Sequence, residues 1–344
     1  MLAIRRRNIF LIQPIFLALV ILVTACQSEL PWPEPTSNLD QGGLAASVEI
    51  GPGGAEEPAG AAIDLQSTPP RATADSYSTS DRPDDIDGYQ IHFIYALPSD
   101  GKDDFFDVNG KIALSAAAVN YWLENKIGRR LRYDTYQGDL DVSFMLLDAT
   151  ADQISGLGTD ILALIEHEIK TRSFNREHKL YVVHYDGFFV TREGYCGLAS
   201  FPPEGAGITA VLLLRGYNPT LDLTCPRQFT QSKDYTGYFE MTILHELLHL
   251  MGMVPDCAPN YADGHVDDSS QDLLNFEYDG SYSPLYTYLD LHNDDYYDHG
   301  NADCPDLARS IFLDPLPLNA ELPPNWANSI QYVPPDPLAT STED

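Results

Sequence analysis

Residues 245–252, which read HELLHLMG, constrain the fold of this 344-residue chain more than any other stretch. Residues four positions apart in an α-helix share a face, so His245 and His249 would present their imidazoles side by side. Apolar residues fill the surrounding positions at helical spacing, and a glycine closes the pattern. The sequence therefore predicts a helix over residues 235–251 with two histidines and Glu246 clustered together.

This spacing suits a catalytic zinc site. Two histidines four residues apart on a helix are a known pair of zinc ligands, and a glutamate directly after the first lies beside the ion. Zinc lowers the pKa of a bound water, and a carboxylate then takes its proton as the water attacks a carbonyl. We predict that His245 and His249 bind zinc and that Glu246 is the general base. The competing interpretation is a buried helix with two core histidines.

The run H-E-x-x-H-x-x-G resembles the metzincin group of zincin metallopeptidases. In that group the glycine turns the chain, a His or Asp three residues later is the third ligand, and a Met turn lies beneath the zinc. Here Pro255 occupies the third-ligand position, and Leu274 replaces the methionine. Segments 254–259, 264–266 and 272–274 also resemble a little-characterised set of secreted bacterial zincin-like proteins. The resemblance implies peptidase chemistry without naming a substrate.

The third zinc ligand must come from elsewhere, because Pro255 has no ligating side chain and its ring ends the helix. We favour His265, since imidazole is a common zinc ligand and a disulfide of Cys257 would hold its loop against the body. Asp256 is the first alternative, although it is one residue out of the usual register. The lower-ranked alternatives are Glu277, His292 and His299.

The amino terminus has the pattern of an export signal. Arginines at residues 5–7 precede an apolar run from Ile9 to Val23, which ends in the sequence VTAC. This arrangement predicts a signal peptide over residues 1–25. The VTAC run also resembles a bacterial lipobox, so we predict that Cys26 receives lipid and tethers the exported protein to the cell surface or envelope. An ordinary cleaved signal with an incidental cysteine is the alternative.

The rest of the chain divides by composition. Residues 26–85 are rich in Pro, Gly, Ala, Ser and Thr, which predicts a disordered lipoprotein stalk. Residues 86–314 alternate strand and helix patterns and form the expected zincin-like metallopeptidase domain, and residues 315–344 form a Pro-rich C-terminal tail. The expected strands are 89–95, 131–136, 141–147, 180–184 and 208–214, and the expected helices are 109–127, 159–172 and 235–251. The predicted class is α+β, with one mixed, mostly parallel sheet and an active-site helix bearing HExxH.

Four cysteines remain after the lipobox position: Cys196, Cys225, Cys257 and Cys304. An even number in an exported chain predicts two disulfides, for which three connectivities are possible. No CxxC spacing occurs, which disfavours a cysteine-based zinc site. We favour the sequential pairing, which joins the first cysteine to the second and the third to the fourth.

Charge restricts the partners. The chain has 20 Lys+Arg against 51 Asp+Glu, a formal net charge of -31, which disfavours binding to nucleic acid. The same charge repels anionic lipid, so we expect membrane contact through the lipid anchor only. Acidic clusters at Asp267, Asp268 and Asp272 and at residues 292–298 offer oxygen ligands for Ca²⁺, but neither has a known loop spacing. Solvated surface is the competing interpretation of these clusters.

Together these features predict a monomeric, cell-surface zinc metallopeptidase that hydrolyses a peptide or protein substrate. One alternative is a catalytically inactive zincin-fold surface binding protein, which Pro255 and Leu274 favour. Another is a zinc amidase acting on cell-wall material. The presence of Glu246 favours catalysis, because a purely structural zinc site has no use for a base.

Overall fold

The computed structural model describes residues 78–172, 174, 177–191, 195–199, 207–220, 222–225, 227–275 and 286–339. The expected signal peptide, the lipid-attachment residue Cys26, most of the expected stalk and Glu277 lie outside the described residues. Across the described ranges, no helix is both long enough and apolar enough to cross a membrane.

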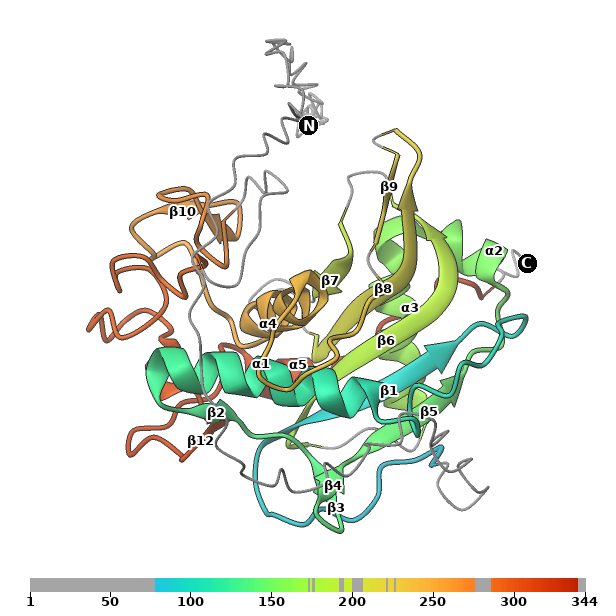
Figure 1. The fold of residues 1–344 in the computed structure, drawn as a ribbon, viewed down its shortest axis with the longest axis horizontal. Coiled ribbons are helices and arrows are strands. Elements are labelled where there is room, and N and C mark those ends of the chain that lie inside the picture. The colour runs from blue at the N-terminus through green and yellow to red at the C-terminus, as the bar shows by residue number, and fades with distance from the viewer. Residues whose placement is uncertain are drawn as a thin grey trace, which may run out of the picture. The chain divides into compact units, whose positions relative to one another are not determined.

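A six-stranded sheet forms the centre of the described chain (Figure 1). Its strands, in spatial order, are β5 (Val142–Leu146), β1 (Gln90–Leu97), β6 (Lys179–Val190), β8 (Thr209–Asn218) and β7 (Gly197–Ala199). The first four are parallel to one another. Strand β7 and the short β9 (Leu223–Thr224) run antiparallel to β8. The predicted mixed, mostly parallel sheet is confirmed.

Helices cover both faces of this sheet. Helices α1 (Lys111–Ile127) and α4 (Tyr238–Leu250) lie on one face, and α3 (Ile161–Thr171) lies on the other (Figure 1). The short α2 (Ala151–Ser155) and a 3-10 turn, η2 (Gly158–Asp160), precede α3. All eight residues of β1 are buried, as expected for a parallel strand with both faces covered.

The remaining elements are short. They are β2 (Arg130–Leu131), β3 (Thr135–Tyr136), β4 (Asp139–Leu140), β10 (Tyr261–Ala262), β11 (His265–Val266), η3 (Leu307–Arg309), β12 (Leu313–Asp314) and α5 (Trp326–Gln331). Most of the described chain after α4 therefore lies outside long helices and strands.

One predicted element is wrong: residues 131–136 do not form a single strand. Strand β2 pairs with β12, whereas β3 pairs with β4. The chain changes partner between them because Asp134 turns into the interior, where its carboxylate lies 2.6 Å from both His92 Nδ1 and Lys179 Nζ. A buried ion pair thus interrupts the strand pattern.

Packed chain continues on both sides of residues 86–314. Before this range, Asp81 and Asp84 accept hydrogen bonds from Lys179 Nζ at 2.7 and 2.6 Å. After it, the ring of Trp326 lies 5.6 Å from the rings of Tyr89 and Phe312. The described part of the expected stalk and the start of the expected tail therefore both contact the body.

Two disulfide bridges connect the loops to the body. Cys196 pairs with Cys225, and Cys257 pairs with Cys304. These are the pairs favoured from the sequence. The first bridge lies at the start of β7, and the second encloses the hairpin formed by β10 and β11.

Candidate metal centre

Helix α4 carries the HELLH motif and is anchored at its amino end by Glu240. The Glu240 carboxylate accepts hydrogen bonds from the backbone N–H of Gly237 at 2.8 Å and of Thr230 at 2.9 Å. It also accepts one from the hydroxyl of Ser115 in α1. The helix ends at Leu250, and Gly252 follows it with a φ of +77°, which suits glycine, and an N–H that donates to the carbonyl of His249. Both ends of the helix that bears the histidines are therefore fixed.

His265 reaches the same place from a β-hairpin. Strands β10 and β11 pair antiparallel across the two residues Asp263 and Gly264, whose φ angles are both positive, at +49° and +81°. Two successive left-handed residues form the tight turn that favours the sequence Asp-Gly. His265 is the first residue after this turn.

The three imidazoles converge on one point. Ring centroids lie 4.7 Å apart for His245 and His249, 4.8 Å for His249 and His265, and 5.3 Å for His245 and His265. One ligand nitrogen from each ring lies within 4.8 Å of the others. The Nε2 atoms of His245 and His249 are 3.0 Å apart. The structure thus brings together all three histidines that the sequence analysis favours as ligands.

Backbone carbonyls orient two of these rings. His245 Nδ1 lies 2.8 Å from the carbonyl oxygen of Leu273, and His265 Nδ1 lies 3.1 Å from that of Asp263. A carbonyl oxygen only accepts, so each Nδ1 carries the proton and each Nε2 keeps its lone pair. The loop that holds Leu273 also supports β11, because Val266 N–H donates to the carbonyl of Leu274 at 2.8 Å.

This arrangement fits zinc. Two nitrogens bound to a tetrahedral zinc, each about 2.0–2.1 Å from the ion, lie about 3.3 Å apart, close to the observed separation of 3.0 Å. Three histidines also leave a fourth position open, as a catalytic zinc requires.

Burial keeps the three imidazoles neutral. It lowers the pKa of His245 to about 4 and that of His249 well below its usual value, and the neighbouring imidazoles add to both shifts. Burial also lowers the pKa of His265. A metal ligand must be unprotonated, so these shifts favour a cation over protons at this site.

Glu246 lies beside the histidines and is 7% exposed. Burial raises the pKa of its carboxyl group to about 8. A divalent cation bound next to it would counteract this rise, because a positive charge stabilises the carboxylate. A cation held by the three imidazoles would therefore make this carboxyl group more acidic.

The other residues considered as ligands lie elsewhere. Asp256 is exposed and does not belong to any group of converging ligand atoms among the described residues. His299 Nε2 donates to the carbonyl of Pro305 at 3.0 Å, and His292 pairs with Asp268 at 3.4 Å. Asp256 is thus not brought to the three imidazoles.

The acidic loops contain two further groups of converging ligand atoms. One comprises Asp268, His292 and Asp294, and the other Asp290, Asp294 and Asp295. Backbone N–H groups already bond to Asp290, including those of residues 294–297. Calcium binding at these loops stays a prediction.

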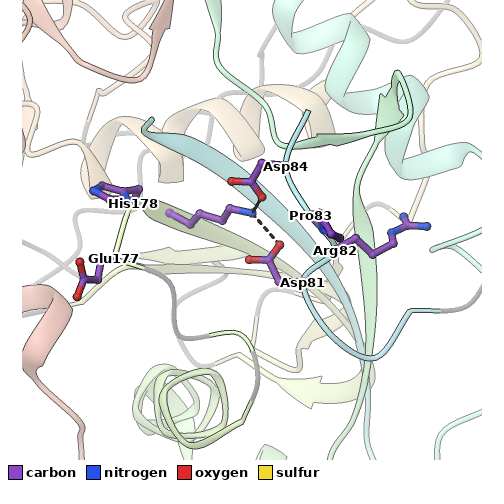
Figure 2. Close-up of a pocket in the computed structure, with 7 residues that line it drawn as sticks. Asp81, Arg82, Pro83, Asp84, Glu177 and His178 are labelled. Atoms are coloured by element: carbon purple, nitrogen blue, oxygen red, sulfur yellow. Dashed lines mark hydrogen bonds and ion pairs between the residues drawn. The ribbon is translucent and has the colours of Figure 1, made fainter. Parts of the chain in front are cut away.

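The pocket drawn in Figure 2 is separate from the histidines. It has a volume of about 530 Å³ and is lined by residues 81–84 and 177–179. Lys179 Nζ donates hydrogen bonds to the carboxylates of Asp81 and Asp84, and both acids are labelled in Figure 2. None of the predicted catalytic or metal-binding residues lines this pocket.

Two contributors to the site were missed from the sequence. The first is the carbonyl of Leu273, which any residue could supply and which leaves no signal. The second is Gly197, which approaches Glu246 closely from β7. The sequence did contain one signal for Gly197. It directly follows Cys196, a cysteine expected to form a disulfide, so the bridge would fix the position of a residue that has no side chain.

No family model matches this chain, and no curated protein matches it. The solved structures that match include archaemetzincin from Methanopyrus kandleri, 14% identical, covering 57% of this chain and 84% of that chain with a TM-score of 0.29. Another is a chaperone–substrate complex, 15% identical, covering 51% of this chain and 26% of that chain with a TM-score of 0.27. At these values the likenesses carry no argument, so the function must be argued from the site.

Proposed function

We propose that this chain is a zinc-dependent metallopeptidase with a zincin-like fold. The observation that supports it is the convergence of His245, His249 and His265 on one point with Glu246 beside them. Three neutral imidazoles and an adjacent carboxylate are the donor set and the base that metal-assisted hydrolysis needs.

The residues have distinct roles in this proposal. Zinc, when bound, lowers the pKa of a water and polarises the carbonyl under attack. The three histidines hold the ion, and the carbonyls of Leu273 and Asp263 keep two of their rings in the binding orientation. Glu246 accepts the proton of the attacking water and returns it to the leaving amine.

An extended substrate has a place to bind in this proposal. Strand β7 is the last strand of the sheet order, so one of its edges has no partner among the described strands. Gly197 of this strand lies against Glu246. A peptide that pairs with the free edge of β7 would therefore run past the base, and its main-chain hydrogen bonds would be independent of sequence.

Metal removal tests the proposal. The mature protein should cleave fluorescently labelled casein, and a zinc chelator should reduce the cleavage to background. Adding back zinc should restore the rate, whereas magnesium should not, since the three ligands are imidazoles and magnesium prefers oxygen. Cleavage that persists in a protein shown to be free of metal would contradict the proposal.

The same assay addresses the alternatives. An inactive binding protein would hold zinc and cleave nothing, and a cell-wall amidase would release fragments from peptidoglycan but leave casein intact. The absence of a ligand at Pro255 favoured the inactive alternative, and the position of His265 weakens that reason because it offers a third imidazole. We therefore keep peptide-bond hydrolysis as the proposed reaction.

We also propose that the protein acts outside the cell, tethered through Cys26. The motif VTAC and the preceding apolar run support this placement. A Cys26→Ala variant should move from the membrane fraction to the soluble fraction or remain unprocessed, as judged by fractionation and mass spectrometry. A variant that stays on the membrane with normal cleavage would rule out the lipid anchor.

A further inference from the structure

Gly197 lies so close to Glu246 that a larger residue at position 197 would displace the Glu246 side chain. A Cβ atom at this position would lie 2.6 Å from Glu246 Cγ and 2.8 Å from Cδ, and it would also meet Oε1. All three atoms belong to the same side chain. The Glu246 side chain therefore packs directly on the bare Cα of Gly197, which is the use of glycine where another group approaches the strand closely.

No described residue forms a hydrogen bond or an ion pair with the carboxylate of Glu246. Glu240, on the same helix, shows the contrast, because its carboxylate accepts from Gly237, Thr230 and Ser115. Glu246 is nevertheless 7% exposed. Packing therefore helps to place this side chain, and one surface that it packs on is Gly197 of β7.

Strand β7 is itself anchored at this point. Cys196, the residue before Gly197, forms a disulfide with Cys225. The carbonyl of Cys196 also accepts a hydrogen bond from the N–H of Leu213 in β8 at 2.9 Å. On the other side of the bridge, Cys225 Sγ lies 2.5 Å from where a Cβ would stand on Gly216 of β8. The bridge therefore lies close to the sheet and ties the start of β7 to it.

We propose that Gly197 is a positioning residue for the general base, which sets where the Glu246 carboxylate stands beside the zinc ligands. The Cys196–Cys225 bridge holds Gly197 in that place. The role of Gly197 in the reaction rests on the proposed peptidase function, whereas its packing role does not. Misplacing a catalytic group by about 1 Å costs up to about 100-fold in rate. A single methyl group at residue 197 should therefore lower the rate of hydrolysis.

The kinetic test is Gly197→Ala. We expect kcat on labelled casein to fall about 10–100-fold while KM changes less than about 2-fold and zinc content stays at the wild-type level. The control is Gly156→Ala, at a glycine with φ of −68° at the end of α2, which should leave kcat unchanged. A wild-type kcat in Gly197→Ala overturns the proposal. Loss of zinc also overturns it, because the residue would then act on the metal site.

A stability cycle tests the packing contact without an activity assay. Gly197→Ala should lower Tm by about 2–8 °C in the wild-type chain, since it overpacks the contact with Glu246. In a Glu246→Ala background the three contacted atoms are absent, so the same change should shift Tm by less than about 1 °C. Equal losses in both backgrounds overturn the proposal.

The kinetic test and the Tm cycle still give an answer if a variant fails to fold or if the wild-type chain is inactive. If Gly197→Ala does not fold, recovery of folding in the double variant supports the contact, and failure of both proteins overturns it. If the wild-type chain hydrolyses nothing, the proposed function fails, and the Tm cycle alone still decides whether Gly197 positions Glu246.

Discussion

Replacing His265 with alanine is expected to empty the metal site. His265 supplies one of three imidazoles whose nitrogens converge, and its loss leaves only the pair on α4. Losing an outer partner of a ligand typically costs about 10–100-fold in metal affinity, and losing the ligand itself should cost more. Purified His265→Ala should therefore contain little zinc by atomic emission, as should His245→Ala and His249→Ala, against about one zinc per wild-type chain.

Two matched variants make this result specific. Asp256→Ala should keep its zinc, because Asp256 is exposed and does not join the histidines. His292→Ala removes an imidazole from the surface, where its side chain is 66% exposed, and should also keep zinc. Full zinc occupancy in His265→Ala together with loss in Asp256→Ala would assign the third ligand to the other register and end the present assignment.

The amphipathic parts of the fold were predictable because they depend on local pattern. Helix α4 ends at Leu250, just before the glycine expected to close it, and the pair His245 and His249 follows from helical spacing alone. The break in residues 131–136 was not predictable in this way. It depends on Asp134 meeting His92 and Lys179, which are distant in sequence and adjacent only in the folded chain.

In the candidate site, too, the local pattern predicted some residues, whereas contacts between distant segments determine others. His265 was favoured on residue type and on a possible disulfide, but the reason it reaches the helix is the tight turn at Asp263 and Gly264. The register of that hairpin is set by the turn, so a shift of one residue would point His265 away from His245 and His249. The contact of Gly197 with Glu246 joins a strand to a helix and carries no periodic signal.

The two disulfides brace different parts of the site. Cys257–Cys304 encloses the hairpin that presents His265, and Cys196–Cys225 adjoins the strand that contacts Glu246. If the proposed function holds, metal binding and the placement of the base would therefore rely on separate bridges. The separation explains why the variants proposed for His265 and for residue 197 have different readouts, zinc content for one and kcat for the other.

Changing Glu246 to glutamine is expected to remove hydrolysis and leave zinc in place. Glutamine has nearly the same shape, so it should fill the same space against Gly197, but its amide cannot accept the proton of the attacking water. Loss of a general base costs about 10²–10⁴-fold in rate. The neutral amide is also cheaper to bury than a carboxylate at a residue only 7% exposed, so Tm should not fall.

Glu124→Gln provides the matched control, because Glu124 lies on the exposed side of α1 and the substitution is chemically identical. This variant should retain both zinc and the wild-type kcat on labelled casein. Unchanged hydrolysis in Glu246→Gln would assign the base to another residue. Loss of zinc from Glu246→Gln would instead mean that the carboxylate is a ligand, because a residue that acts only on the water leaves the three imidazoles and their ion intact.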